Sequence, residues 1–476
     1  MNLYEITKAV FGELLEGSQN PEKKTDNSLD TRLNSGLRVS TDTRSIKAGE
    51  LFIPLVGKNF DGHNFLELAQ EKGACAALVQ KNYWQKSKPG FKMPIILVKD
   101  TLKALQDLAH HHRSKYNIPV IGITGSNGKT TAKDLIANVL KQKLNVVKSR
   151  GSFNNEIGLP LTLLEINSDT QAVVVEMGMR GLGQITELAD IAKPTMGVVT
   201  SVAPVHIDIL KTIENIAAAK GELPRSIDKS GKVFLNGEDA WCIKMKEWTE
   251  AEVNFFGLND SCKYYAEDIK VDLHKSKFKL KVSDKTKDME LPVPGKHNVL
   301  NSLAAVGVAY ELGFDLETIS RGLSTAAISE KRLEKITLDN GIILINDTYN
   351  ANPTSMKASI NILAQANAVN TRKVAVLGDM YELGEYEKEG HLSVGVHAYN
   401  NGVDMLITVG ELGRLIAKGA VDSGMSEGSV FSFSDNREAA DFLKKNLGQG
   451  DIVLFKGSRA AKVEEIVNQL NEALLK

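Results

Sequence analysis

The sequence predicts an α/β protein of about three domains, and three observations lead to this prediction. The chain has 476 residues, more than the roughly 250–300 at which a single hydrophobic core stops growing. Apolar runs without polar alternation are separated by amphipathic helical stretches, a pattern typical of parallel sheets covered by helices on both faces. A glycine-rich turn ending in Lys129 and Thr130 joins one such run to one such helix, which indicates a phosphate-binding loop.

Residues 1–100 are expected to form a small N-terminal α/β domain. Residues 1–17 predict an amphipathic helix, because charged side chains interrupt the apolar pattern that a signal peptide would need. The polar stretch 17–36 predicts a mobile loop. Strands are expected at 51–56 and 94–98.

Residues 101–328 are expected to form a central phosphate-loop domain with a doubly wound, mostly parallel sheet, and residues 329–476 a C-terminal Rossmann-like α/β domain. A polar stretch around Ser329 predicts a hinge between them. The helix after the phosphate loop begins at Lys129. The expected strands are 118–124, 172–176, 197–200 and 232–235, then 341–346, 373–377, 405–409 and 451–455.

Composition excludes several classes of partner. The 58 basic and 59 acidic residues give a net charge of −1, so we expect neither nucleic acid nor an anionic membrane as the main partner. No apolar run approaches the ~20 residues that span a bilayer, so no membrane insertion is expected. The cysteines, Cys75, Cys242 and Cys262, form no CxxC pair, which argues against disulfides or zinc and favours a reducing cytoplasm.

The segment 122–131 carries the strongest chemical signal. Gly125 and Gly128 permit a tight turn, and backbone N–H groups at a helix N-terminus bind anions. Lys129 adds a charge for phosphate, and Thr130 a hydroxyl for Mg²⁺. Ile123 replaces the first glycine of the generic pattern, but the Thr-Gly-x-x-Gly-Lys-Thr core is intact. The expected nucleotide-binding residues are Gly125, Ser126, Asn127, Gly128, Lys129, Thr130 and Thr131.

This loop resembles that of the Mur ligases and the folylpolyglutamate synthases, and the resemblance extends from about residue 40 to 476. It also rests on segments 176–178, 203–208, 217–222 and 295–305. Segments 152–158, 347–353 and 377–384 resemble the Mur ligase that joins D-alanyl-D-alanine to UDP-N-acetylmuramoyl-tripeptide. The resemblance implies a cytoplasmic, monomeric, ATP-dependent ligase of peptidoglycan precursor synthesis that works through an acyl phosphate.

The resemblance assigns catalysis to Lys129, His206 and Lys220. Glu176 ends a buried strand, where open α/β sheets bind ligands. Together with Thr130 and His206 it would hold Mg²⁺, with two ions expected. Lys220 would be carbamylated by CO₂, which turns a cation into an anion able to position Mg²⁺.

Further residues are expected to bind the two nucleotides. Asn298 and Asn301 share one helix face and offer donors and acceptors to adenine. The resemblance directs Arg332 towards phosphate, Asp347 towards ribose and Tyr349 towards adenine. The expected residues for the uridine nucleotide or its peptide are Thr41, Asp42, Thr43, Arg44, Asn154 and Asn155. For the asparagines, helix or turn capping is the alternative.

Three other functions stay open at this point. A sister ligase that adds the third amino acid usually carries Asp-Asn-Pro-Arg or Asp-Asp-Pro-Arg, and the sequence contains neither. A folylpolyglutamate synthase-like enzyme shares the phosphate loop. A nucleotide-binding protein without ligase turnover is the alternative of a different class.

Overall fold

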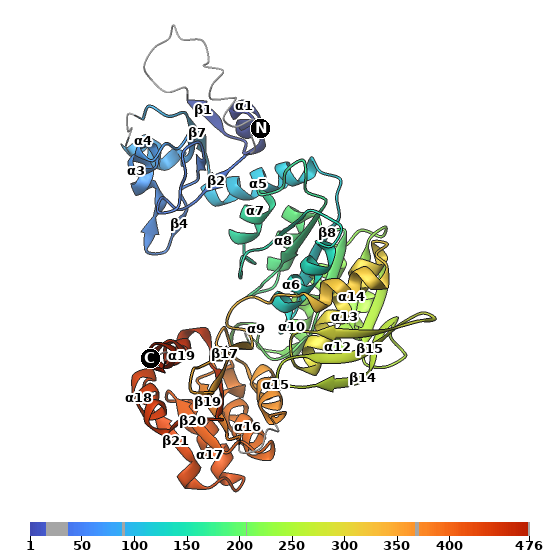
Figure 1. Cartoon of the computed structure of the whole chain (residues 1–476). Coiled ribbons are helices and arrows are strands. Elements are labelled where there is room, and N and C mark those ends of the chain that lie inside the picture. Colours follow the sequence, from blue (N-terminus) through green and yellow to red (C-terminus); the bar gives the residue numbers. More distant parts are fainter. Residues whose placement is uncertain (16–36, 88–90, 206, 367–370, 475–476) are drawn as a thin grey trace. The chain divides into compact units, whose positions relative to one another are not determined.

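The computed structural model describes residues 1–15, 37–87, 91–205, 207–366 and 371–474. The predicted loop 17–36 therefore lies outside the described residues. The chain forms two compact units, and Figure 1 labels their elements. The first consists of Met1–Gly122, Lys143–Met179 and Gly183–Met196, and the second of Ile123–Gln142, Arg180–Leu182 and Gly197–Lys476. The division into three domains at residues 100 and 328 stays a prediction.

The first unit contains a five-stranded sheet in the order β1-β7-β6-β3-β2. Buried Phe52, Ala77, Val79, Ile95 and Leu97 belong to its hydrophobic core. The elements of this part are α1 (Leu3–Ala9), β1 (Glu13–Leu15), β2 (Val39–Ser40), β3 (Leu51–Phe52), β4 (Val56–Gly57), β5 (Phe60–Asp61), α3 (Leu66–Glu71), β6 (Ala76–Gln80), α4 (Lys81–Ser87) and β7 (Ile95–Val98).

The prediction of one helix over residues 1–17 was wrong. Asn2 caps α1 by accepting the Glu5 N–H at 2.8 Å, and the helix ends at Ala9. A Cβ on Gly12 would lie 2.7 Å from the Ile96 side chain, so the chain passes close to β7 there. The next three residues pair with β7 as the antiparallel strand β1, because sheet pairing satisfies their backbone groups. The predicted strand 51–56 likewise divides into β3 and β4.

The first unit also contains most of the helices and strands that precede residue 197. Asp100 caps α5 through the Lys103 N–H at 2.8 Å. Strand β10 coincides with the predicted strand 172–176, and all of it is buried. The strand order here is β8-β10-β9. The elements are α5 (Thr101–Ser114), β8 (Val120–Thr124), β9 (Val146–Lys148), α7 (Gly158–Leu163), β10 (Ala172–Glu176) and α8 (Gln184–Ala192).

The second unit contains strands in the order β16-β15-β14-β13-β12-β11. Strands β12, β13 and β14 are parallel, whereas β14, β15 and β16 are antiparallel. This meander was not predicted from the sequence, although the burial of β15 alternates with the period of two that is typical of a strand. The strands are β11 (Met196–Val199), β12 (Lys232–Asn236), β13 (Glu252–Gly257), β14 (Tyr264–Val271), β15 (Ser276–Val282) and β16 (Lys285–Leu291).

Helices α6 and α13 pack together in this unit. Helix α6 begins at Lys129, as predicted. The helices of this part are α6 (Lys129–Leu140), α9 (Ile207–Leu210), α10 (Ile213–Lys220), α11 (Glu222–Arg225), α12 (Ala240–Lys244), α13 (Lys296–Glu311) and α14 (Leu316–Ser324).

The C-terminal part of the second unit has a six-stranded sheet in the order β17-β18-β22-β19-β20-β21. Strand β17 is antiparallel and the others are parallel. Ala375 and Leu377 point to one hydrophobic core and Val374 and Val376 to another, so both faces of the sheet are covered. All four strands predicted in this part are present. They are β18 (Ile343–Asn346), β19 (Lys373–Gly378), β20 (Met405–Val409) and β22 (Ile452–Lys456), joined by β17 (Glu334–Thr337) and β21 (Val430–Phe433).

The helices of this part divide between the two faces. Residues of α15, α16 and α17 belong to one core and residues of α18 and α19 to the other. Across the described ranges, no helix has both the length and the apolar character to cross a membrane. The helices are α15 (Pro353–Ala364), α16 (Glu387–Asn400), α17 (Gly413–Asp422), α18 (Asn436–Asn446) and α19 (Glu464–Leu474).

Candidate active site

The phosphate loop joins β8 to α6, and its two glycines are required by space as well as by backbone conformation. Gly125 has φ +146°, and a Cβ there would lie 2.0 Å from Thr200 Oγ1. Gly128 has φ +83°, and a Cβ there would lie 2.4 Å from Asn301 Oδ1. No described side chain caps the N-terminus of α6. The first N–H groups of this helix therefore offer a site for an anion.

Hydrogen bonds to the end of β11 and the residues after it fix the loop between these glycines. The Ser126 N–H donates to the Ser201 carbonyl at 2.8 Å, and the Ser126 hydroxyl donates to the Ala203 carbonyl at 3.0 Å. Thr200 Oγ1 donates to the Asn127 carbonyl at 2.5 Å. These bonds orient the loop backbone before any ligand binds.

Two predicted catalytic lysines interact in the second unit. Lys129 Nζ donates to the Gly125 carbonyl at 2.7 Å, while Thr130 and Thr131 are buried in the first turn of α6. Lys220 ends α10 and is 3% exposed. Burial, and secondly the positive charge of Lys129, hold the Lys220 pKa well below its ordinary value. Both effects make the protonated form of Lys220 less favourable than it is for a lysine in water.

Arg332 lies at the start of α6. Its Nη2 donates to Thr130 Oγ1 at 2.9 Å, and its guanidinium lies 4.1 Å from the Tyr349 ring centroid. The Nε atom is buried and has no hydrogen-bond partner within the described part of the chain. An unsatisfied buried donor costs about 1–3 kcal/mol, which an anionic oxygen would offset. Arg332 and Tyr349 lie together, and their roles towards phosphate and adenine stay predictions.

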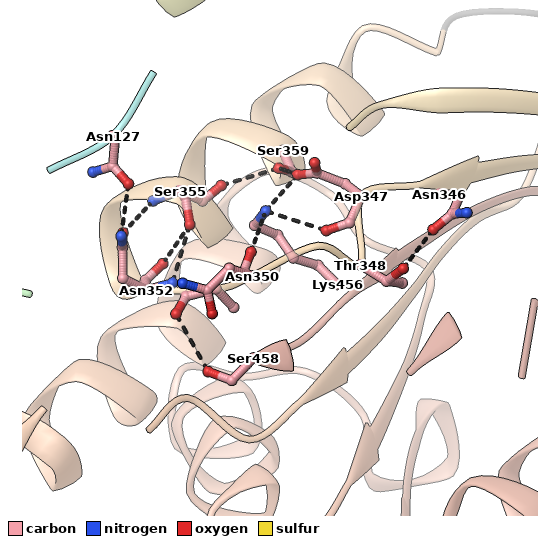
Figure 2. A network of polar contacts seen from close by, with 11 residues as sticks. Asn127, Asn346, Asp347, Thr348, Asn350, Asn352, Ser355, Ser359, Lys456 and Ser458 are labelled. Carbon is pink, nitrogen blue, oxygen red and sulfur yellow. Dashed lines mark hydrogen bonds and ion pairs between the residues drawn. The ribbon is translucent and has the colours of Figure 1, made fainter. Parts of the chain in front are cut away.

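Asn352 connects the N-terminus of α15 to the phosphate loop (Figure 2). Its Oδ1 accepts the Ser355 N–H at 2.8 Å, and the Ser355 hydroxyl completes the capping box. The Asn352 Nδ2 donates to Asn127 Oδ1 at 2.6 Å. One side chain thus caps a helix with its oxygen and contacts the phosphate loop with its nitrogen.

Asp347 lies beside Lys456 and Ser359 in the same network (Figure 2). Its Oδ2 accepts from Lys456 Nζ at 2.5 Å and from the Ser359 hydroxyl at 2.6 Å. Lys456 also donates to the Asn350 carbonyl at 3.1 Å. The Asp347 carboxylate is therefore held in place by the buried Lys456 cation. Burial lowers the pKa of the neighbouring His297 to about 4, although the negative charge of Asp347 acts in the opposite direction.

Asn298 and Asn301 are both buried on α13. The Asn298 Nδ2 donates to the Pro294 carbonyl at 2.7 Å, so this amide helps to begin the helix. The Asn301 side chain lies against Gly128. Their predicted contact with adenine stays a prediction.

Asn154 and Asn155 have different partners in the first unit. The Asn154 Nδ2 donates to Glu176 Oε1 at 2.8 Å, and Glu176 is 2% exposed. Asn155 Oδ1 accepts the Gly158 N–H at 2.9 Å, which is the capping alternative. Asn154 orients the carboxylate predicted to bind metal, whereas Asn155 begins α7.

Residues 41–44 make mainly local contacts. Arg44 is 89% exposed in its side chain and pairs with Asp42, Nη2 to Oδ2, at 2.7 Å. This bond is the main cause that lowers the Asp42 pKa. Thr43 is buried, and its carbonyl accepts from Lys72 Nζ at 2.7 Å. Thr41 is half-buried.

Two of the three residues predicted to bind Mg²⁺ carry the type of ligand atom that this ion prefers. Glu176 and Thr130 supply oxygen atoms, the ligand type that Mg²⁺ prefers. His206, the third predicted ligand, lies outside the described residues. Within the described ranges, no three His, Cys, Asp or Glu side chains gather into a group that could hold a metal.

Comparison with known families decides the family of this chain. The Mur ligase middle domain matches residues 123–309, and the Mur ligase glutamate ligase domain matches residues 331–459. The Mur ligase family catalytic domain matches residues 38–113. The chain belongs to the Mur ligase family. The predicted α/β fold is confirmed by its likeness to solved Mur ligase structures.

Individual Mur ligases are similar over nearly the full length. The UDP-N-acetylmuramoyl-tripeptide–D-alanyl-D-alanine ligase of Bacillus subtilis is 38% identical over 92% of this chain and 93% of its own. The enzyme of that name from Escherichia coli is 33% identical over 91% and 93%. A crystal structure of MurF from Acinetobacter baumannii covers 99% of this chain and 98% of its own, with a TM-score of 0.85 and 29% identity. MurF from Thermotoga maritima in complex with ADP has a TM-score of 0.79 and 26% identity.

Several residues with notable contacts in this Mur ligase were not singled out from the sequence. Asn352 was included only within segment 347–353, and Lys456, His297 and Asp134 were given no role of their own. Asn352 was recognisable as a helix cap, because Pro353 follows it. Asp134 gave no usable signal, since a carboxylate within a helix is usually exposed.

Proposed function

We propose that this chain is an ATP-dependent ligase that joins D-alanyl-D-alanine to UDP-N-acetylmuramoyl-tripeptide, acting as a cytoplasmic monomer in peptidoglycan precursor synthesis. The observation that carries the proposal is a spatially constrained phosphate loop in a chain matched over nine-tenths of its length by ligases of that name. Absence of the diamino-acid signature argues against the sister ligase.

The reaction would begin with attack of the tripeptide's terminal carboxylate on the γ-phosphorus of ATP. This attack forms an acyl phosphate and releases ADP. The free amine of D-alanyl-D-alanine then attacks the acyl carbon, the bond to phosphate breaks, and the amine proton leaves. Lys129 and the N-terminus of α6 would stabilise charge on the transferring phosphoryl group. The remaining task of the protein is positioning.

Thr130, Glu176 and His206 are proposed to hold Mg²⁺, with two ions in the active enzyme. Bound Mg²⁺ would neutralise negative charge on the phosphate oxygens. The contact between Asn154 and Glu176 supports a metal role for this carboxylate, because ligands are commonly oriented by an outer partner.

Carbamylation of Lys220 is proposed because this lysine is buried and its surroundings lower the pKa of the amine, which makes the protonated form less favourable. The Nζ lone pair would form a bond to the carbon of CO₂ and one proton would leave, which yields an anion beside Lys129. Carbon-13 NMR of enzyme in ¹³CO₂-enriched buffer should show a carbamate signal that is absent from Lys220→Ala. No difference between the two spectra would overturn this assignment.

The nucleotide roles are also proposals. Arg332, Asp347 and Tyr349 would contact the phosphate, ribose and adenine of ATP, with Asn298 and Asn301 supporting the adenine side. Residues 41–44 would bind the uridine nucleotide, with Arg44 facing its diphosphate. The stacking of Arg332 on Tyr349 supports the ATP roles.

Phosphate release from Mg·ATP tests the function. We expect release only when UDP-N-acetylmuramoyl-tripeptide and D-alanyl-D-alanine are both present, and its loss in Lys129→Ala. Lys141→Ala, at the exposed C-terminal end of α6, is the matched control and should keep activity. Release driven by a single amino acid would assign a sister ligase. ATP binding without release for any substrate set would favour the non-catalytic alternative.

A further inference from the structure

The linker between α14 and β17, residues 325–333, lies along the phosphate-loop helix α6. The Asp134 Oδ2 accepts from both the N–H and the hydroxyl of Ser329, at 3.1 Å and 2.6 Å. Three residues later, Arg332 donates to the Thr130 hydroxyl at 2.9 Å. Thr130 and Asp134 are four residues apart and share one face of α6. The linker therefore runs antiparallel to the helix and is attached to it at two successive turns.

Asp134 is built into the protein interior. Its side chain is 1% exposed, and Lys133 Nζ lies 3.5 Å from its Oδ1. One carboxylate oxygen thus faces a buried cation while the other binds the linker. A buried carboxylate with this arrangement is rigid, because both oxygens have partners and the helix fixes its Cα.

The linker conformation depends on such attachments. Lys331 has φ +60° and Leu333 has φ +55°, conformations that L-residues other than glycine rarely adopt. The Lys331 carbonyl accepts the Tyr349 N–H at 3.2 Å. Arg332 lies between these two residues, so surrounding contacts must hold the backbone of both neighbours of Arg332 in an unfavourable conformation.

We propose that Asp134 is a positioning residue of the ligase reaction, which anchors Ser329 so that Arg332 reaches the nucleotide phosphates at the start of α6. The proposal rests on the role of Arg332 towards phosphate given above. Asp134 fixes the position of Ser329 along α6. The three residues that follow Ser329 then set the position of the Arg332 guanidinium. Without this anchor, the linker relaxes and Arg332 loses its place beside Thr130.

A double-mutant cycle between Asp134 and Arg332 tests the proposal. In Asp134→Asn, we expect kcat to fall about 10- to 100-fold while KM for ATP changes less than about threefold, because misplacement affects the transition state more than ground-state binding. In an Arg332→Ala background, Asp134→Asn should lower kcat by less than about twofold, since residues that act as one unit are not additive.

Asp315→Asn is a matched control. Asp315 accepts the Thr318 N–H and hydroxyl at 2.8 Å and 3.0 Å, the same chemistry at a helix cap away from the linker. It should leave kcat unchanged. If Asp134→Asn does not fold, Ser329→Ala replaces it, with Ser329→Thr as the conservative variant that restores kcat.

Hydrogen exchange gives a second readout, independent of turnover. The peptide containing Ser329 and Arg332 should exchange faster in Asp134→Asn than in the parent, and not in Asp315→Asn. The role of Asp134 is overturned if Asp134→Asn lowers kcat by the same factor in the Arg332→Ala background as in the parent. It is also overturned if hydrogen exchange of that peptide is the same in Asp134→Asn as in the parent. Full activity of Arg332→Ala alone overturns the role assigned to Arg332 instead, so the two failures are distinguishable.

Discussion

The phosphate loop and residues 41–44 are both expected to bind phosphate groups, but their surroundings differ. The loop is in contact with distant segments: Gly125 abuts Thr200 and Gly128 abuts Asn301. Arg44, in contrast, contacts Asp42 two residues away and is 89% exposed. The first site is rigid before a ligand binds, whereas the second holds its arginine only by a local ion pair.

This difference separates two kinds of mutational effect. A change in the phosphate loop disturbs packing between distant segments, so it should lower both stability and activity. A change at Arg44 should alter binding alone, because exposed ion pairs contribute little to folding. The free energy of unfolding therefore gives one scale on which the two sites can be compared.

The largest effect is expected for Gly125→Ala. The added Cβ would lie 2.0 Å from Thr200 Oγ1, and φ +146° disfavours an L-residue, so we expect about 3–4 kcal/mol of destabilisation and no phosphate release. Gly49→Ala is the matched control, because its φ is +86° with nothing within 4 Å. It should cost about 1 kcal/mol. Urea unfolding measures the loss of unfolding free energy in both variants. Equal losses would show that the close contact with Thr200 adds nothing to the cost of the unfavourable backbone conformation.

A smaller effect is expected at the far end of α13, the helix that places Asn301 against Gly128. Burial of Glu311 would raise its pKa, but hydrogen bonds from Lys232, Lys263 and Tyr264 outweigh burial and lower the pKa to about 2. The unfolded pKa is about 4.3, so this stabilisation is complete above that pH and is lost as the pH falls towards 2.

The measurement is the unfolding free energy of the parent and Glu311→Gln between pH 7 and pH 3.5. At pH 7 we expect Glu311→Gln to cost about 2 kcal/mol, because two lysines lose their carboxylate. The difference between the two proteins should shrink as the pH falls below about 4.5. A difference that is constant with pH would mean that the Glu311 carboxylate is not responsible.

Hydrogen bonds of the loop itself should contribute less. Thr200→Val removes the donor to the Asn127 carbonyl at 2.5 Å with little change of shape, and should cost about 1 kcal/mol. Thr43→Val is the comparison at the other site, where the buried threonine accepts from Lys72 Nζ through its backbone carbonyl, a contact that the variant keeps. Its cost should be smaller. Thermal unfolding of both variants measures the two losses of stability. A larger loss for Thr43→Val than for Thr200→Val would contradict the expected order.

The elements around the phosphate loop were predicted better than those at the N-terminus, for physical reasons. A strand, two glycines and Lys-Thr at a helix start are short-range signals, so the start of α6 at Lys129 was predicted correctly, as were β10 and β20. The helix at residues 1–17 failed because pairing of β1 with β7 is a long-range contact. The roles of Asn352 and Asp134 depend on distant partners, Asn127 and Ser329, which spacing cannot reveal.

The smallest effect on stability is expected for Arg44→Ala. The guanidinium is almost fully exposed and its partner Asp42 is also solvated, so the unfolding free energy should not change measurably. Activity should respond, because the proposed bidentate contact of the guanidinium with the diphosphate would be lost. We expect KM for the uridine nucleotide substrate to rise about tenfold with little change in kcat, the signature of lost ground-state binding. Initial-rate kinetics measure this, with Arg38→Ala as the control on the same segment. A fall in kcat with unchanged KM would place Arg44 in the reaction step, and the contrast between the two sites would fail.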